Sequence, residues 1–419
     1  MRSGYSNMKC GLIGEHLGHS FSPLIHNELS DYSYDLHELA PSELEGFLKS
    51  GMLDAFNVTI PYKKQVMPYL DEISPEAVSI GSVNTVVKDK CGKLHGYNTD
   101  YFGFNYTVDL SGIDITGTKA IVLGRGGASL TVCAVLRDRG VRELVVVGSK
   151  DNTPENLAKH ADADIIVNAT PVGMFPNNGA SPADLSMFPN CRLALDLIFN
   201  PARTALILDA ERLGIPYING LPMLVAQAAK AFEYFTGDRF EEGSIEQITS
   251  LITEKTANIV LVGMPGCGKS TVGKLIANIL GRHFFDADDE FTKMHGISPA
   301  DCIKKFGEDR FRELEHKTLC ELGKLSSAVI ATGGGAVTRD FNYDPLHQNG
   351  KIFFIERELS KLARGGRPLS LSTTPDEMYR ARINCYRRFA DVTVVSNEVI
   401  DDTANKIISE FKKITGENK

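Results

Sequence analysis

The chain has 419 residues, too many for one ordinary hydrophobic core, so two or three domains are expected. Its composition, 42% hydrophobic and 23% charged, is typical of a soluble globular protein. The formal net charge of −8 argues against a nucleic-acid partner, which requires clustered lysines and arginines.

The cysteine positions and the hydropathy of the chain argue against several further classes of protein. The eight cysteines are scattered and form no C-x-x-C pair, which disfavours zinc or a redox dithiol and fits a reducing cytoplasm. No apolar stretch reaches the roughly 18 residues of a membrane span, and residues 1–7 lack the apolar core of a secretion signal. We therefore expect a cytoplasmic protein that does not insert into a membrane.

Short apolar runs alternate with helical patterns along the first half of the chain. In residues 8–105 the sequence predicts a helix at 42–50 and strands at 10–13, 55–59 and 83–87. The rhythm is more regular in residues 118–219, with strands predicted at 120–123, 144–147, 164–167 and 193–197. This alternation predicts an α/β fold of parallel sheets with helices on both faces.

A boundary between two domains is expected shortly after residue 250. Residues 222–235 form a predicted helix with a wide apolar face, and a second helix is predicted at 244–253. Residues 255–258 are the expected domain boundary, because the strand, loop and helix pattern restarts at 259.

Two glycine-rich loops, Gly124–Ser129 and Gly263–Ser270, each follow an apolar run and lead into a helical segment. That arrangement aims backbone N–H groups and a helix N-terminus at a phosphate. The second loop matches the pattern GxxxxGK[ST] completely, so that Lys269 is expected to reach the β- and γ-phosphates and Ser270 to ligate Mg²⁺. The first loop lacks the third glycine of a dinucleotide loop. We expect two different nucleotides on one chain, with a GTPase, an ATPase or a small-molecule kinase left open by the second motif alone.

Residues after the second loop restrict its chemistry. Phe284–Asp288 is predicted to be a strand that ends in two carboxylates on one face, suited to a metal and to an acceptor hydroxyl. Arg310–Glu315 follows, and then an apolar run reaches three consecutive glycines, Gly333–Gly335. The glycines are expected to let the backbone approach a ligand closely.

In this order, the segments DADD, FRELE, ATGGG, RPL and RxxxYRxxAD resemble shikimate kinases, over about residues 257–419. The resemblance implies that Asp288 binds the 3-hydroxyl of shikimate and that Asp286 and Ser270 hold Mg²⁺. It implies that the shikimate carboxylate is held by Arg312, Gly334, Gly335 and Arg382. It implies ATP binding by Gly263, Gly266, Gly268, Lys269, Ser270, Thr271, Arg364 and Arg367, with Arg367 stabilising the transferring phosphoryl group. The lid around Arg364 and Arg367 is shorter than is usual in the family, and Asn384 stands where proline is common.

The N-terminal half offers a candidate acid–base pair. Ser20 and Ser22 present two hydroxyls suited to a polyol or a carboxylate, although Ser22 before Pro23 also suits a helix start. Residues 57–63 are predicted to be a buried strand leading into Lys63, and Asp100 follows strand-like sequence. A lysine and an aspartate in one cleft are suited to general acid–base catalysis.

Together with residues 83–85, 168–174 and 220–227, these segments resemble shikimate dehydrogenases over about residues 8–255. The resemblance implies a substrate-binding domain (8–105 and 220–255) and an NADP-binding Rossmann domain (106–219), followed by a P-loop kinase domain (257–419). It implies a catalytic pair, Lys63 and Asp100, and further substrate contacts from Ser20, Ser22, Thr59, Asn84 and Gln227. It implies NADP contacts from Gly124, Gly126, Gly127, Ala128, Ser149, Lys150, Thr170 and Met223.

The cofactor segment departs from the family. Many members carry Asn-Arg-Thr after the second Rossmann strand, where the arginine grips the 2′-phosphate of NADP, and this chain has Gly148, Ser149 and Lys150. Lys150 suits the phosphate and Asp151 suits a ribose diol, and we favour NADP. Arg125 adds positive charge beside the pyrophosphate. Phe199 and Pro222 replace a tyrosine and a glycine common in the family.

The expected function is therefore two steps of aromatic amino-acid biosynthesis. The first is NADPH-dependent reduction of 3-dehydroshikimate to shikimate, with Lys63 as proton donor, and the second is phosphorylation of the new 3-hydroxyl by MgATP. The alternatives are a quinate/shikimate dehydrogenase that uses NAD, a metabolite sensor without catalysis, and a fusion with one inactive half. The oligomeric state and the relative placement of the domains are left open.

Overall fold

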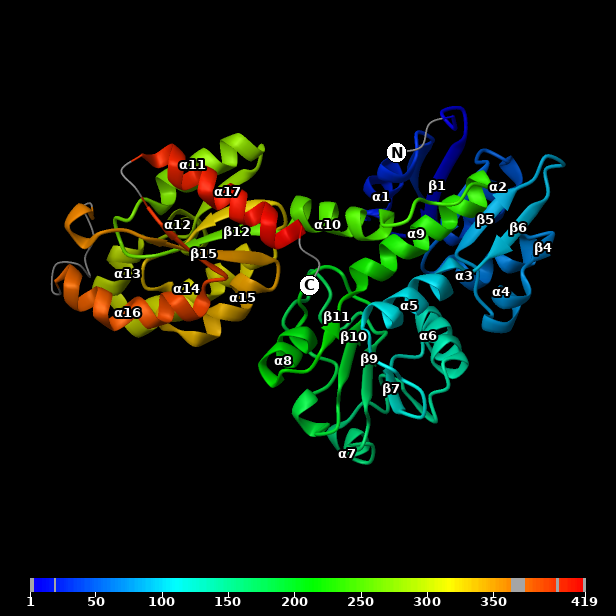
Figure 1. Cartoon of the computed structure of the whole chain (residues 1–419), viewed down its shortest axis with the longest axis horizontal. Coiled ribbons are helices and arrows are strands. Elements are labelled where there is room, and N and C mark those ends of the chain that lie inside the picture. The colour runs from blue at the N-terminus through cyan, green and yellow to red at the C-terminus, as the bar shows by residue number, and fades with distance from the viewer. Residues whose placement is uncertain (1–3, 19, 363–373, 397–398, 417–419) are drawn as a thin grey trace. The chain divides into compact units, whose positions relative to one another are not determined.

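The computed structural model describes residues 4–18, 20–362, 374–396 and 399–416 (Figure 1). The chain divides into two compact units. The N-terminal unit consists of Met1–Met174, Ala180–Phe199 and Leu206–Ile252. The C-terminal unit consists of Phe175–Gly179, Asn200–Ala205 and Thr253–Lys419.

The first sheet of the N-terminal unit has the strand order β2-β1-β3-β5-β6-β4. Its strands are β1 (Lys9–Gly14), β2 (Ser33–Glu38), β3 (Ala55–Val58), β4 (Glu72–Ile73), β5 (Thr85–Lys88) and β6 (Leu94–Tyr97). Its helices are α1 (Ser22–Leu29), α2 (Leu44–Ser50), α3 (Tyr62–Gln65) and α4 (Pro75–Ile80).

The expectation of a purely parallel sheet is wrong for this first sheet. Strand β5 runs antiparallel to both β3 and β6. The physical reason is the short connection from β5 to β6, in which the Asp89 N–H donates to the Lys93 carbonyl and Gly92 has a φ of +84°. A tight turn of this kind returns the chain beside itself, whereas a parallel neighbour needs a long crossover.

The second sheet of the N-terminal unit is entirely parallel, as predicted, with the order β11-β10-β9-β7-β8. Its strands are β7 (Lys119–Leu123), β8 (Glu143–Val147), β9 (Ile165–Asn168), β10 (Leu193–Asp196) and β11 (Tyr217–Ile218). Its helices are α6 (Gly127–Asp138), α7 (Pro154–Ala158) and α8 (Ala205–Leu213). All residues of β7 and β9 are buried, as expected for strands covered on both faces.

The long helices α5 (Thr99–Leu110) and α9 (Gly220–Thr236) complete the N-terminal unit, together with α10 (Ser244–Thr256) as far as Ile252. Helices α5 and α9 pack against each other, and Figure 1 shows them side by side. Gly103 permits this close approach, because a Cβ at that position would lie 2.7 Å from the Met223 carbonyl oxygen. Helix α10 ends at Thr256 and so extends beyond its predicted end at 253.

The C-terminal unit contains a third, fully parallel sheet with the order β13-β14-β12-β15-β16. Its strands are β12 (Asn258–Val262), β13 (His283–Asp286), β14 (Ala328–Ala331), β15 (Gly350–Glu356) and β16 (Val392–Val395). Its helices are α11 (Lys269–Leu280), α12 (Ala287–His295), α13 (Pro299–Phe306), α14 (Glu308–Gly323), α15 (Tyr343–His347), α16 (Pro375–Phe389) and α17 (Ile400–Gly416).

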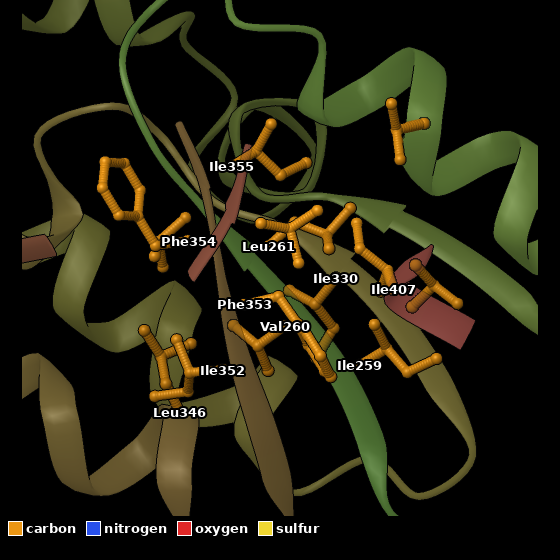
Figure 2. Close-up of a cluster of buried hydrophobic side chains, with 14 of the residues drawn as sticks. Ile259, Val260, Leu261, Ile330, Leu346, Ile352, Phe353, Phe354, Ile355 and Ile407 are labelled. Carbon is orange, nitrogen blue, oxygen red and sulfur yellow. The ribbon is translucent and has the colours of Figure 1, made fainter. Parts of the chain in front are cut away.

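The core of the C-terminal unit surrounds strands β12 and β15 (Figure 2). Every residue from Ile259 to Val262 is completely buried, as are Ile352 to Ile355. Helix residues Leu346 and Ile407 belong to the same cluster. Because both sheet faces are covered, these strands are continuous apolar runs, which is why the sequence located β12 correctly.

Within the described ranges, no helix has both the length and the apolar character that a membrane span requires.

Candidate active sites

The N-terminal unit holds an ion pair in a sheltered position. Lys63 Nζ lies 2.6 Å from Asp100 Oδ2, with the side chains 17% and 10% exposed. Lys63 lies on α3, directly after β3, and Asp100 lies in the first turn of α5, directly after β6. The predicted lysine–aspartate pair therefore forms, although Lys63 lies on a short helix rather than at the end of a strand.

Local capping fixes the position of Asp100. The Asn98 side chain accepts a hydrogen bond from the Tyr101 N–H and so caps α5. Its amide donates to the Ser82 carbonyl at 2.8 Å and to Thr131 Oγ1 of α6 at 3.5 Å. Asn98 thus links the segment that carries Asp100 to α6, the first helix of the second sheet.

Two predicted substrate ligands, Asn84 and Gln227, meet through a residue to which the sequence analysis gave no role. Thr99 donates its backbone N–H to Asn84 Oδ1 at 2.7 Å, and its hydroxyl lies 3.4 Å from Gln227 Oε1. Asn84 also donates to Thr99 Oγ1 at 3.0 Å and to Gln227 at 3.4 Å. The sequence could have indicated Thr99 as a site residue, because it directly precedes the predicted catalytic residue Asp100.

The network continues inward to a second residue without a predicted role. Asn57 donates to Thr85 Oγ1 at 3.1 Å and accepts from the Tyr34 hydroxyl at 2.7 Å. All these groups are buried, and burial of a polar side chain is tolerated only with such partners. The result is a buried, hydrogen-bonded polar network that continues from the predicted substrate residue Asn84.

The remaining predicted substrate residues occupy the same unit. Ser20 is half-buried, and its Oγ accepts the Ser22 N–H at 3.2 Å. Ser22 is buried at the start of α1, where Phe21 rather than Ser22 is the N-cap. Thr59 is half-buried and hydrogen-bonds through its N–H to the Ile13 carbonyl.

The first glycine loop has the form of a phosphate cradle. Gly124 has a φ of +114°, and a Cβ there would lie 2.9 Å from the Ala169 carbonyl oxygen. Gly126 is the N-cap of α6 and Gly127 its first residue, and a Cβ on either would meet open space. Ala128 follows in the first turn, so the free N–H groups of α6 face space that a pyrophosphate can occupy.

Of the two residues predicted to contact the nicotinamide, Thr170 lies close to this loop and Met223 lies close to α5. The Thr170 methyl group would be 3.1 Å from a Cβ on Gly124, and the Thr170 hydroxyl donates to Asn168 at 2.6 Å. Met223 is buried in α9 against Gly103. Ser149 and Lys150 follow β8 and are exposed.

The second glycine loop connects β12 to α11. Gly263, Gly266 and Gly268 all have positive φ, and a Cβ on Gly263 would lie 2.7 Å from the Ile355 carbonyl oxygen. Lys269 is buried and donates to the carbonyls of Gly263 and Met264 at 2.9 and 3.1 Å. The ammonium group is therefore held over the loop that would enclose the phosphates. Thr271 lies one residue after Ser270 in α11 and is exposed.

The predicted strand with two carboxylates on one face is wrong. Strand β13 ends at Asp286, which is the N-cap of α12, and Asp288 lies in the first helical turn. Asp286 Oδ1 accepts the Asp288 N–H at 3.1 Å, while Oδ2 accepts the Ser270 hydroxyl at 2.6 Å. Aspartate at an N-cap is favoured by the free N–H groups of the helix, and this explains the early end of the strand. The hydroxyl and carboxylate still form an oxygen donor set suited to Mg²⁺.

The three glycines have a packing role in addition to the close approach to a ligand that the sequence predicts. A Cβ on Gly335 would lie 2.3 Å from Arg312 Nη2, and one on Gly334 would lie 2.7 Å from Pro265 Cδ. A Cβ on Gly333 would lie 3.1 Å from Glu315 Oε1 and 3.3 Å from Asp288 Oδ1. The glycines therefore let the predicted substrate residues approach the backbone.

Arg312 is buried in this cluster and is held by two carboxylates. Its guanidinium donates to Glu315 at 2.7 Å and to Glu308 at 3.0 Å. Burial raises the pKa of Glu315, while Arg312 opposes that rise. Glu308 and Glu315 were missed as site residues, although the carboxylates stand four residues before and three after Arg312 on α14, within reach on one helical face.

Arg382 of α16 reaches the same cluster and donates to the Gly334 carbonyl at 3.1 Å. Tyr386 donates to the same carbonyl oxygen. The structure thus brings Asp288, Arg312, Gly334, Gly335 and Arg382 together with the second glycine loop. Arg364 and Arg367 lie outside the described residues.

Three stretches of the chain match known protein families. Residues 12–86 match the shikimate dehydrogenase substrate binding domain, and residues 220–247 match the shikimate 5′-dehydrogenase C-terminal domain. Residues 265–412 match shikimate kinase.

Individual relatives agree with these matches. A shikimate dehydrogenase (NADP(+)) of Caldanaerobacter subterraneus subsp. tengcongensis is 38% identical over 260 residues, covering 55% of this chain and 92% of the relative. The crystal structure of shikimate 5-dehydrogenase from Thermus thermophilus, in complex with NADP(H) and shikimate, is 33% identical with a TM-score of 0.53 and covers 58% of this chain and 98% of that one. A chorismate mutase/shikimate 5-dehydrogenase fusion protein from Clostridium acetobutylicum is 34% identical with a TM-score of 0.55, covering 59% of this chain and 98% of that one.

Proposed function

The chain belongs to the shikimate dehydrogenase family and carries a shikimate kinase domain, and from this premise we propose that it catalyses two consecutive reactions on one metabolite. The activities are those of a shikimate dehydrogenase that uses NADP and of a shikimate kinase that uses ATP, which makes the chain a shikimate-pathway enzyme. The proposed order is reduction of 3-dehydroshikimate to shikimate and then phosphorylation of shikimate to shikimate 3-phosphate.

The observation that carries the proposal is the presence in one chain of two sets of reactive groups, one in each unit. Lys63 and Asp100 form a sheltered acid–base pair in the N-terminal unit. Lys269, Ser270 and Asp286 form a phosphate and metal set in the C-terminal unit. The first set is suited to proton transfer and the second to phosphoryl transfer, which favours an enzyme over a binding protein without catalysis.

In the proposed reduction, NADPH when bound supplies the hydride that reaches C3 of the substrate. The Lys63 ammonium group donates a proton to the C3 oxygen, so that the carbonyl becomes a hydroxyl. Asp100 keeps Nζ in position through the 2.6 Å contact. Asn84, Thr99 and Gln227 present polar groups that hold the other substrate oxygens.

In the proposed phosphorylation, the 3-hydroxyl oxygen attacks the γ-phosphorus of ATP and the bond to the β–γ bridging oxygen breaks, releasing ADP. Asp288 accepts the hydroxyl proton, and Lys269 neutralises charge on the phosphoryl group. Ser270 and Asp286 would hold Mg²⁺, which lowers the charge repulsion between ATP and the acceptor. Arg312 and Arg382 form a cationic cluster suited to the substrate carboxylate.

The test supplies the purified chain with 3-dehydroshikimate, NADPH and MgATP and follows NADPH loss and shikimate 3-phosphate formation together. Lys63→Ala is expected to abolish the first step and leave phosphorylation of added shikimate intact. Lys269→Ala is expected to abolish phosphorylation and to leave the reduction of 3-dehydroshikimate intact.

The alternative functions are tested separately. Parallel assays with quinate and NAD⁺ show whether the chain is instead a quinate dehydrogenase. A wild-type chain that binds shikimate and turns over neither substrate would instead be a metabolite sensor.

A further inference from the structure

An open cleft of about 460 Å³ lies over the carboxyl end of β8. Its polar lining includes Arg125, Lys150, Asp151, Thr153 and Asn156. Strands β7 and β8 are neighbours, with Leu123 paired to Val147, so the cleft adjoins the glycine loop at their shared edge. In a dinucleotide-binding fold this is where the adenosine ribose lies.

Arg125 extends from the glycine loop into this cleft. Its Nη2 lies 2.7 Å from Asp151 Oδ2 and 3.4 Å from the Val146 carbonyl oxygen. The side chain crosses the backbone of Gly148, where a Cβ would lie 3.0 Å from Arg125 Cδ and 3.1 Å from Nε. A side chain at residue 148 would therefore have to push the arginine aside by a few tenths of an ångström, so the glycine leaves Arg125 free to take this path.

The pair of Arg125 and Asp151 has the character of an exchangeable contact rather than a structural one. The arginine side chain is 60% exposed and the aspartate side chain 45% exposed, and ion pairs in water stabilise a fold little. A guanidinium released from Asp151 can form two parallel hydrogen bonds to a phosphate, which carries more charge than a carboxylate. Lys150 supplies a second cation on the cleft lining.

We propose that Arg125 determines the preference of the dehydrogenase for NADP over NAD, by exchanging Asp151 for the 2′-phosphate of the adenosine ribose. This inference rests on the proposed function, since it specifies how the same site distinguishes its cofactors. Asp151 holds the guanidinium over Gly148 until the phosphate arrives, and Lys150 adds a weaker attraction. In NAD binding no phosphate displaces Asp151, which keeps its contact with Arg125 and accepts the ribose diol through its other oxygen.

The test measures dissociation constants of NADP⁺ and NAD⁺ by calorimetry on the full chain without substrate. Arg125→Ala is expected to weaken NADP⁺ binding by roughly tenfold to a hundredfold, because hydrogen bonds to a charged group are lost. The dissociation constant of NAD⁺ is expected to change by less than about threefold, because NAD⁺ lacks the 2′-phosphate that would form these hydrogen bonds. Arg142→Ala is the matched control, because Arg142 is an exposed arginine just before the opposite end of β8 and outside the cleft lining.

Two further variants make the outcome specific. Asp151→Asn is expected to strengthen NADP⁺ binding and weaken NAD⁺ binding. Arg125→Ala combined with Ser149→Arg is expected to restore much of the NADP⁺ preference by returning an arginine from the segment that follows β8. Equal weakening of both nucleotides by Arg125→Ala, in a chain that keeps its melting temperature, would assign Arg125 to the pyrophosphate and overturn the inference, with the proposed function intact. A wild type that binds neither nucleotide would overturn the proposed function itself.

Discussion

Gly335 lies so close to Arg312 that a Cβ on residue 335 would stand 2.3 Å from the guanidinium Nη2. Arg312 is buried and is fixed on its other side by Glu308 and Glu315, so it has little room to withdraw. Arg312 can therefore occupy this position only because residue 335 has no side chain.

Gly335→Ala is therefore expected to displace Arg312 and to raise the kinase KM for shikimate by roughly tenfold to a hundredfold, in line with the cost of overpacking a rigid site. The ATP KM should change much less. Steady-state kinetics with each substrate varied checks this, and the dehydrogenase activity of the same preparation reports whether the chain is folded. An unchanged shikimate KM would mean that Arg312 does not hold the substrate.

Thr99 offers a second test, in the N-terminal unit. Thr99→Val removes the hydroxyl that joins Asn84 to Gln227 and leaves two buried amide side chains short of a partner. We expect the dehydrogenase KM for shikimate to rise roughly tenfold, the usual effect of an unmade buried hydrogen bond. Thr107→Val is the control, because its hydroxyl lies on the same helix and donates only to the Gly103 carbonyl. Equal effects of the two variants would point to a general loss of helix stability.

Metal binding gives a third test. Asp286→Asn keeps a side chain that caps α12 but removes the negative charge beside Ser270. The Mg²⁺ concentration for half-maximal kinase activity should rise by roughly tenfold, because Mg²⁺ depends on carboxylate ligands. Asp289→Asn, an exposed neighbour on the same helix, should leave the Mg²⁺ requirement unchanged. If both variants respond alike, Asp286 does not support the metal.

The parts of the fold that sequence predicts well are those in which local pattern and tertiary environment agree. Strands β7 and β12 are apolar runs between a polar segment and a glycine loop, and their burial on both sheet faces preserves that pattern. The β5–β6 hairpin was missed although Asp89 and Gly92 are turn residues, because the alternating rhythm of the chain favoured crossovers.

The sequence predicts which residues belong to the two candidate sites, but it does not predict how these residues are arranged. Lys63 and Asp100 were identifiable by resemblance, whereas their 2.6 Å contact depends on how α3 and α5 are packed. The reason for three successive glycines lies in side chains that approach from elsewhere in the chain, such as Pro265 and Arg312. The contact of Arg125 with Asp151 was likewise not predictable, because it depends on the absent side chain of Gly148, which opens that path.

The last prediction concerns pH and the buried residue His26. Its ring stacks on Tyr34 at 3.9 Å, and Nδ1 lies 2.7 Å from the Tyr32 hydroxyl. Burial lowers the pKa of His26 to about 3, against a smaller opposing effect of Asn57. In the unfolded chain the imidazole titrates near 6.5, so the unfolded state binds the extra proton between these two values. Stability from neutral His26 is thus present above about pH 6.5 and is lost as the pH falls towards 3.

At pH 5 this linkage is expected to cost about 2 kcal/mol, from about 1.5 pH units at 1.36 kcal/mol each. Hydrogen exchange of the α1 amides, measured from pH 5 to 7, reports the opening free energy of this region. The double variant His26→Phe with Tyr32→Phe keeps the stacked rings, leaves no unpaired hydroxyl and should flatten the pH dependence. His16→Gln, which removes an exposed histidine of the same unit, should leave the slope as in the wild type. A slope retained in the double variant would show that other groups set the acid sensitivity of α1.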